Sequence, residues 1–109
     1  MSAITTHVLD AVLGKPASGI LVHLDKEAAS GWTQLAESIT DGDGRCRDLC
    51  PDGGNGAYRL TFAVGAYFAR LGRNSIYPEI TITFLVDGQR HYHIPLLLSD
   101  HSYTTYRGS

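Results

Sequence analysis

Histidine is the residue type in this chain best suited to proton transfer, because an imidazole with its ordinary pKa of about 6.5 can gain or lose a proton near neutral pH. The sequence contains five histidines. His91 and His93 lie two positions apart, so on a strand both would project from one face, with Tyr92 on the other. This spacing leaves three interpretations open: a solvated outer face, an acid–base site or a metal site.

A zinc site would need more ligands than this pair supplies. His7 could provide one, but no cysteine or carboxylate stands at a spacing that completes a tetrahedral set. Cys46 and Cys50 do not match zinc-ligand spacings, and we expect them to be free thiols without a function. The run Asp41-Gly42-Asp43-Gly44 resembles a calcium loop only in part, because Arg45 occupies the next ligand position. We therefore predict no metal site.

The elements that would position these residues are mostly strands. Alternating apolar and polar residues between Gly, Pro, Asp and Asn clusters predict strands, with a further short strand beginning at Arg45. The longer predicted strands cover residues 4–9, 20–25, 32–38, 58–64, 80–86, 89–98 and 101–106. Because strands recur at such short intervals, the pattern is typical of a β-sandwich.

One segment departs from strand periodicity. Between Gly65 and Gly72 the side chains of Tyr67, Phe68 and Leu71 follow helical spacing, which predicts a short helix. Further on, the pair at 87–88, Asp-Gly, predicts a hairpin turn that joins strands 80–86 and 89–98. The sequence thus predicts a single all-β domain over residues 1–109, a two-sheet antiparallel sandwich of seven to eight strands with one short helix; a barrel is the alternative.

Composition excludes several classes of partner. The net charge of -2, with Lys and Arg scattered along the chain, argues against a nucleic-acid binder, which needs a basic face. No apolar run approaches the ~20 residues of a membrane helix. The ends of the chain carry neither a secretory leader nor a peroxisomal address, so we expect a cytoplasmic protein with no membrane partner.

The C-terminal residues are unusual because strand-like sequence continues over 102–109, where chains commonly fray. Something should hold this tail in place. Tyr106, Arg107 and Ser109 present a phenol, a guanidinium and a hydroxyl there. Composition alone leaves open whether the tail is docked structure or part of a site.

Four motifs distributed over the whole chain resemble the transthyretin-related family of 5-hydroxyisourate hydrolases. They are Ile4-Thr5-Thr6-His7-Val8-Leu9-Asp10 followed by Gly14-Lys15-Pro16-Ala17, the turn Thr40-Asp41-Gly42-Asp43-Gly44-Arg45, the run His91-Tyr92-His93-Ile94-Pro95-Leu96-Leu97-Leu98-Ser99, and the terminal Tyr106-Arg107-Gly108-Ser109. The third and fourth motifs separate this branch from transthyretin, the hormone carrier of the same fold.

The resemblance implies a homotetramer, a dimer of dimers, whose active sites lie in the channel between dimers. It implies hydrolysis of a purine-derived small molecule, 5-hydroxyisourate, to 2-oxo-4-hydroxy-4-carboxy-5-ureidoimidazoline during urate degradation, without metal or organic cofactor. The implied catalytic residues are His7, Arg45, His93 and Ser109, and the implied substrate-binding residues are His7, Arg45, Tyr106 and Arg107.

The chemistry of the reaction then suggests roles, with His7 and His93 as a proton-transfer pair and Arg45 as the clamp for substrate and oxyanion. Two other functions compete with this one. A transthyretin-like carrier would be expected to line its channel with apolar groups, so imidazoles and a guanidinium favour the enzyme. A metallochaperone using His91 and His93 is the third alternative.

Overall fold

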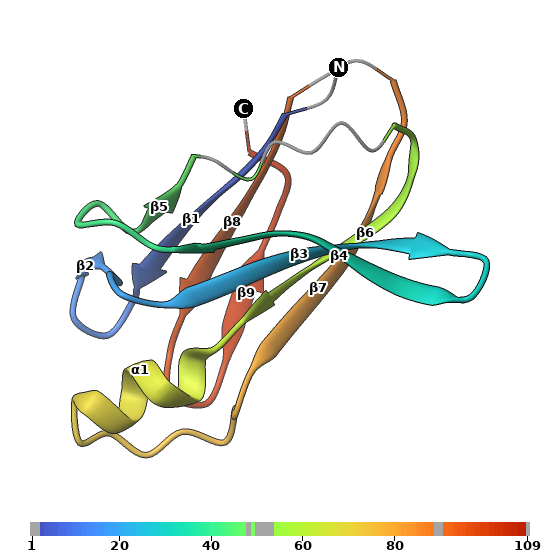
Figure 1. The fold of residues 1–109 in the computed structure, drawn as a ribbon. Coiled ribbons are helices and arrows are strands. Elements are labelled where there is room, and N and C mark those ends of the chain that lie inside the picture. The colour runs from blue at the N-terminus through green and yellow to red at the C-terminus, as the bar shows by residue number, and fades with distance from the viewer. Residues whose placement is uncertain (1–2, 48, 50–53, 89–90, 109) are drawn as a thin grey trace.

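The computed structural model describes residues 3–47, 49, 54–88 and 91–108, and these form two packed β-sheets with one short helix (Figure 1). The elements are β1 (Ile4–Asp10), β2 (Lys15–Pro16), β3 (Leu21–Ala28), β4 (Gly31–Ile39), β5 (Arg45–Cys46), β6 (Gly56–Phe62), α1 (Val64–Arg70), β7 (Ile80–Val86), β8 (Tyr92–Leu98) and β9 (Tyr103–Thr105). The predicted all-β sandwich with a short helix is confirmed; β2 and β5 are only two residues long.

The first sheet, called sheet A here, has the order β2-β1-β8-β9, and β5 also pairs with β1. The second, sheet B, has the order β4-β3-β6-β7. Strand pairing between the described elements is antiparallel apart from β1 and β8, which run parallel over seven residue pairs. The prediction of antiparallel sheets therefore holds except at the centre of sheet A.

The core lies between the two sheets and follows from the alternation of each strand. Val8 and Leu96 of sheet A and Val22 and Leu60 of sheet B are completely buried. Along β1 every second residue is buried and the residues between them are only half-buried. Because successive side chains of a strand point to opposite faces, the half-buried set faces outward from sheet A.

The predicted hairpin between 80–86 and 89–98 is wrong. β7 is the edge strand of sheet B, whereas β8 lies in the middle of sheet A, so this connection crosses from one sheet to the other. The buried Tyr92 hydroxyl accepts a hydrogen bond from the Asp87 N–H at 2.8 Å and donates one to the Asp87 carbonyl oxygen at 2.9 Å. A side chain thus satisfies the backbone groups that a hairpin partner would have satisfied.

Helix α1 follows β6 and lies at the end of the sandwich remote from the two chain termini (Figure 1). Tyr67 and Phe68 are buried as the helical spacing predicts, but Leu71 is 46% exposed, against the prediction. The helix ends at Arg70, and the Leu71 N–H turns back to the Phe68 carbonyl. Leu71 therefore leaves the helical face before it can pack against the core.

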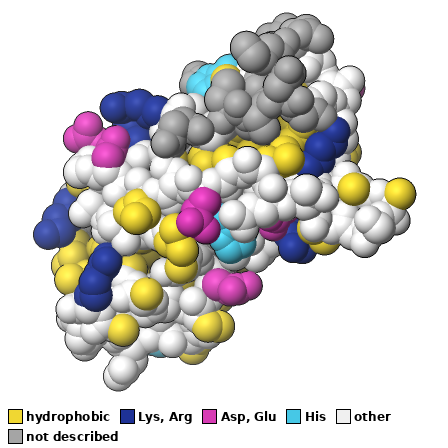
Figure 2. All heavy atoms as spheres, viewed as in Figure 1, with side chains coloured by type: hydrophobic (Ala, Val, Ile, Leu, Met, Phe, Trp, Pro, Cys, Tyr) yellow, Lys and Arg dark blue, Asp and Glu magenta, His cyan; other side chains and the backbone are white. Residues whose placement is uncertain are grey.

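On the face drawn in Figure 2, Lys and Arg side chains are dispersed and Asp and Glu side chains lie between them. A phosphate-binding surface would instead gather its cations on one face or along one groove. No helix within the described ranges is long and apolar enough to cross a membrane.

Candidate active site

The parallel pairing of β1 with β8 brings two distant motifs together on sheet A. Its register sets Thr5 opposite His93 and His7 opposite Pro95. On the other edge of β1, β5 sets Arg45 opposite His7. Because residues directly opposite each other point to the same face of a sheet, these side chains share the outer face of sheet A.

A cavity of about 220 Å³ opens on this face, and its lining consists of Thr5, Thr6, Arg45, Arg47, His91 and His93. The lining thus contains two imidazoles and two guanidinium groups. His7 stands beside this lining, as the register partner of Arg45, rather than within it. The cavity therefore offers proton acceptors next to fixed positive charge, which is what hydrolysis of a carbonyl compound requires.

The turn before β5 holds Arg45 against β1. The Asp41 carboxylate accepts hydrogen bonds from the N–H groups of Asp43 at 2.9 Å and Arg45 at 3.0 Å, which confirms the turn predicted for this segment. The Arg45 N–H is the main reason that the pKa of Asp41 lies below its ordinary value. Gly44 has φ +76°, and a Cβ there would lie 2.3 Å from the Val8 carbonyl oxygen, so this close approach requires glycine.

The environment of His93 changes its protonation equilibrium. Its partial burial lowers its pKa below 6.5, and the positive charges of Arg45, His91 and His7 lower it further. A lowered imidazole pKa means that the neutral ring persists at neutral pH. His93 therefore presents a lone pair that can accept a proton from water.

The C-terminal tail packs directly on His93. The Gly108 N–H donates to the His93 carbonyl oxygen at 2.7 Å, and the two residues form an antiparallel bridge. A Cβ on Gly108 would lie only 2.6 Å from His93 Cδ2, so no other residue fits without displacing the imidazole. In the sequence, Gly108 is distinguished only as a glycine in a tail of otherwise larger residues.

Tyr106 and Arg107 are not among the residues that line the cavity. Tyr106 is 57% exposed. The Arg107 guanidinium lies 4.3 Å from the ring centroid of Tyr92, a buried residue on the core side of β8. Ser109 lies outside the described residues. Of the six predicted site residues, the structure thus brings together His7, Arg45 and His93.

Thr5 is a site residue that the sequence analysis missed. Its Oγ1 lies 2.7 Å from His91 Nε2 and 2.8 Å from His93 Nδ1. In the sequence, Thr5 could have been found from its position two residues before His7, which places both on one face of a strand.

Arg47 also lines the cavity but was not predicted as a site residue. Its side chain is 64% exposed and lies 3.8 Å from the carboxylates of Asp41 and Asp43.

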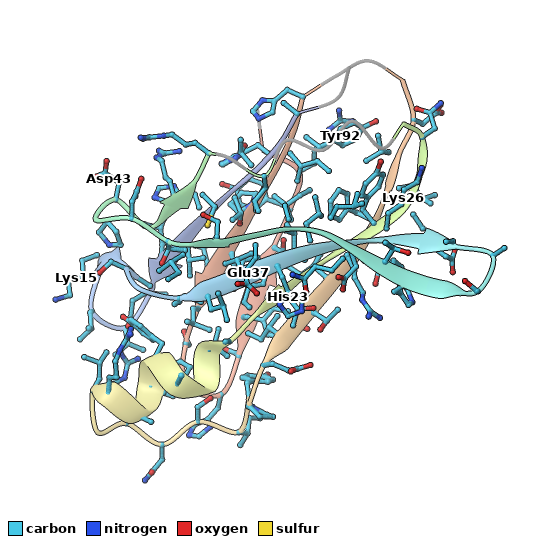
Figure 3. The ribbon with its side chains drawn as sticks, viewed as in Figure 1. Lys15, His23, Lys26, Glu37, Asp43 and Tyr92 are labelled. Atoms are coloured by element: carbon cyan, nitrogen blue, oxygen red, sulfur yellow. The ribbon has the colours of Figure 1, made fainter. Side chains whose placement is uncertain are left out.

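The other two histidines lie away from this cavity. His23 is on β3 in sheet B, opposite Glu37 of β4, and Figure 3 shows both residues on these front strands, well separated from the Asp43 turn. His101 is exposed between β8 and β9. Within the described ranges, no three His, Cys, Asp or Glu side chains are grouped so as to hold a metal ion. Cys46 is buried in the core, and Cys50 lies outside the described residues.

A larger cavity, of about 500 Å³, lies between β2 and α1. Its lining includes Lys15, Tyr67 and Arg70 but no histidine or carboxylate. The Arg70 guanidinium is occupied by hydrogen bonds to the carbonyl oxygens of Ser18 and Gly19. None of the predicted site residues that the structure describes lines this cavity.

The fold and the cavity together define a class: a small two-sheet β-sandwich with a cavity lined by imidazole and guanidinium groups on the outer face of one sheet. The sequence profile of the HIUase/Transthyretin family matches residues 4–108. The chain belongs to the HIUase/Transthyretin family.

Individual relatives divide between the two branches of this family. A 5-hydroxyisourate hydrolase from Salmonella dublin is 43% identical over 109 residues, an alignment that covers 97% of this chain and 80% of the relative. The structure of Klebsiella pneumoniae 5-hydroxyisourate hydrolase has a TM-score of 0.86 at 39% identity, covering 100% of this chain and 94% of that one. Sea bream transthyretin in complex with thyroxine has a TM-score of 0.92 at 33% identity, covering 97% of this chain and 94% of that one. The fold matches both branches, whereas the identity is higher to the hydrolases.

Proposed function

We propose that this protein hydrolyses 5-hydroxyisourate to 2-oxo-4-hydroxy-4-carboxy-5-ureidoimidazoline, a step of urate degradation. The observation that carries the proposal is the juxtaposition of Arg45 with His93, whose pKa is lowered, in one cavity. Relatives named 5-hydroxyisourate hydrolase, at about 40% identity over nearly the whole chain, support it.

In the proposed reaction, a histidine activates water, which is a poor nucleophile at neutral pH. The lowered pKa of His93 suits it to take the proton as water attacks a ring carbonyl. His7 lies on the same face and completes a proton-transfer pair that later protonates the leaving ring nitrogen. Neither step requires a metal or an organic cofactor.

Arg45 stabilises the negative charge that develops on the carbonyl oxygen. Its planar guanidinium can hold a flat, anionic heterocycle through two parallel hydrogen bonds, a geometry that the ammonium of lysine cannot reproduce. Interactions of this kind act mainly on the transition state and therefore on kcat.

The tail and the assembly complete the proposed site. Tyr106 and Arg107 bind the substrate edge and Ser109 takes part in catalysis, which requires the Arg107 guanidinium to leave the ring of Tyr92. In the proposed homotetramer, a dimer of dimers in the cytoplasm, the outer faces of sheet A meet across a channel and close the cavity. Sedimentation of the protein as a tetramer would support this arrangement, and a monomer would contradict it.

A transthyretin-like binding protein is the second candidate, favoured by the TM-score of 0.92 to a thyroxine-bound transthyretin. The imidazole and guanidinium groups in the cavity lining argue against a hydrophobic hormone, because they would lose their hydration without gaining partners. A fluorescence titration with thyroxine separates the two candidates.

The direct test uses 5-hydroxyisourate generated freshly from urate with uricase, whose decay is followed by ultraviolet absorbance. We expect the protein to accelerate the decay in proportion to its concentration and to bind no thyroxine. Decay at the spontaneous rate, combined with saturable thyroxine binding, would instead establish the carrier.

A further inference from the structure

The hydroxyl of Thr5 lies between two imidazoles and can bridge them. It is 2.7 Å from His91 Nε2 and 2.8 Å from His93 Nδ1, while the two ring centroids are 6.2 Å apart. The parallel register of β1 and β8, which sets Thr5 opposite His93, fixes this placement. All three residues line the cavity, and because His91 is exposed while His93 is half-buried, the bridge joins the more buried ring to the more exposed one.

The tautomers of His91 and His93 depend on each other, because both rings hydrogen-bond the same hydroxyl group. A threonine hydroxyl donates one hydrogen bond, and a neutral imidazole carries a proton on only one of its two nitrogens. When Thr5 donates to His91 Nε2, His93 Nδ1–H donates to Thr5, and His93 Nε2 keeps a free lone pair. When Thr5 donates to His93 Nδ1, the His93 proton lies on Nε2 and the ring cannot act as a base there.

We propose that Thr5 is a positioning residue which, with His91, forms a proton relay that sets the tautomer of His93 and carries positive charge from His93 to solvent. The inference rests on the proposed function and deepens it. As His93 Nε2 takes a proton from the attacking water, its Nδ1 proton passes to Thr5 Oγ1, and the Thr5 hydroxyl proton passes to His91 Nε2. His91 then releases its Nδ1 proton to solvent, so every ring ends neutral.

The charged groups around His93 favour moving a proton away from this ring. Among the described residues, the titratable groups that face it are Arg45 of β5, Arg47 just after β5, His7 of β1 and His91 just before β8, and all of these are basic. Of the described tail residues, Gly108 is in contact with it and carries no side-chain charge. A proton left on His93 would therefore lie among cations, whereas a proton on exposed His91 is solvated.

The test compares Thr5→Val, which keeps the shape but removes the hydroxyl, with Thr5→Ser, which keeps the hydroxyl. Nitrogen-15 NMR of the intact protein identifies which nitrogen of His93 carries the proton. We expect Nδ1–H in the wild type and in Thr5→Ser, and a shift towards Nε2–H in Thr5→Val. An unchanged His93 tautomer in Thr5→Val would overturn the inference, whether or not the protein proves to be a hydrolase.

Kinetics supply the second readout. We expect Thr5→Val to lower kcat by about 10²-fold with little change in KM, as for a lost general base, and Thr5→Ser to restore most of it. Thr83→Val, at an exposed position of sheet B, is the matched control and should keep wild-type kcat. Wild-type kcat in Thr5→Val would overturn the relay while leaving the proposed function intact.

His91→Phe keeps the test decisive if Thr5→Val does not fold. It removes the solvent end of the relay at an exposed position. We expect a fall in kcat at unchanged KM, together with a shift of the His93 tautomer. Wild-type kcat and tautomer in this variant would overturn the inference.

Discussion

The central chemical feature of this site is an imidazole, His93, beside the guanidinium of Arg45. Burial first, and then the charge of Arg45, lowers the pKa of His93. Removing the Arg45 charge should therefore raise the His93 pKa, so that protonation occurs at a higher pH. In an NMR titration of Arg45→Met we expect the His93 midpoint to lie above the wild-type midpoint; an equal or lower midpoint would contradict this electrostatic account.

The geometry of Arg45 matters as well as its charge. Arg45→Lys keeps the positive charge but loses the planar fork, and we expect kcat for 5-hydroxyisourate to fall by about 10²-fold, as for a lost oxyanion donor. Arg70→Lys, on α1 at the other end of the molecule, is the control and should retain wild-type kcat. Equal activity of the two variants would show that Arg45 supplies charge alone.

Among the elements, the C-terminal tail is bound to β8 through the backbone pairing of Gly108 with His93. A methyl group at that position would lie 2.6 Å from His93 Cδ2, so Gly108→Ala must displace either the tail or the imidazole. We expect a folded protein whose kcat is lowered about tenfold or more, because small misplacements of reacting groups are costly. Gly42→Ala, where a Cβ meets nothing within 4 Å, is the matched control; comparable kcat in both variants would mean that the tail does not position His93.

Strand positions could largely be predicted from sequence, but their pairing could not. The alternation of β6 and β7 gave the correct inward faces, because burial on one side of a strand imposes a period of two. The Asp87-Gly88 pair led to the wrong prediction of a hairpin, because a local turn pattern cannot show that the next strand enters the other sheet. Tyr92, the first residue of β8 in sheet A, hydrogen-bonds both backbone groups of Asp87, which follows β7 of sheet B.

The site residues could likewise be predicted only in part, because the pairing of distant strands is not visible in the sequence. His7, Arg45 and His93 could be proposed from motifs that resemble a known family, and the structure places them on one face. Thr5 and Gly108 could not, since neither titrates near neutral pH and their roles depend on the parallel pairing of β1 with β8 and on the tail contact. Positioning residues become visible only when distant segments meet.

At the scale of the whole molecule, a buried ionic network ties sheet A to the segment after α1. Asp10 is completely buried; it accepts hydrogen bonds from Tyr67 at 2.7 Å and from Arg73 at 2.5 Å, and Arg73 also pairs with Asp100. Burial alone would raise the pKa of Asp10, but hydrogen bonds from Arg73, the Leu13 N–H and Tyr67 outweigh it and leave the pKa lowered. Burial and Asp10 raise the pKa of Tyr67 to about 12.

Because the folded state lowers the pKa of Asp10, the ionised network stabilises the protein above the ordinary value of 3.8 and loses this effect as the pH falls below it. Asp10→Asn leaves Arg73 without one of its carboxylate partners and should cost about 3 to 5 kcal/mol of unfolding free energy at neutral pH. Urea unfolding of both proteins measures the difference, which should shrink in acid. A difference that stays constant below pH 3.8 would contradict this role for Asp10.

Histidine variants in the decay assay with fresh 5-hydroxyisourate show whether the imidazoles on the outer face of sheet A carry the hydrolysis. We predict that His7→Ala and His93→Ala each lose most of the acceleration over spontaneous decay, while His23→Ala in sheet B and His101→Ala in the β8–β9 turn retain it. Full acceleration by His93→Ala, or an equal loss in all four variants, would contradict the account.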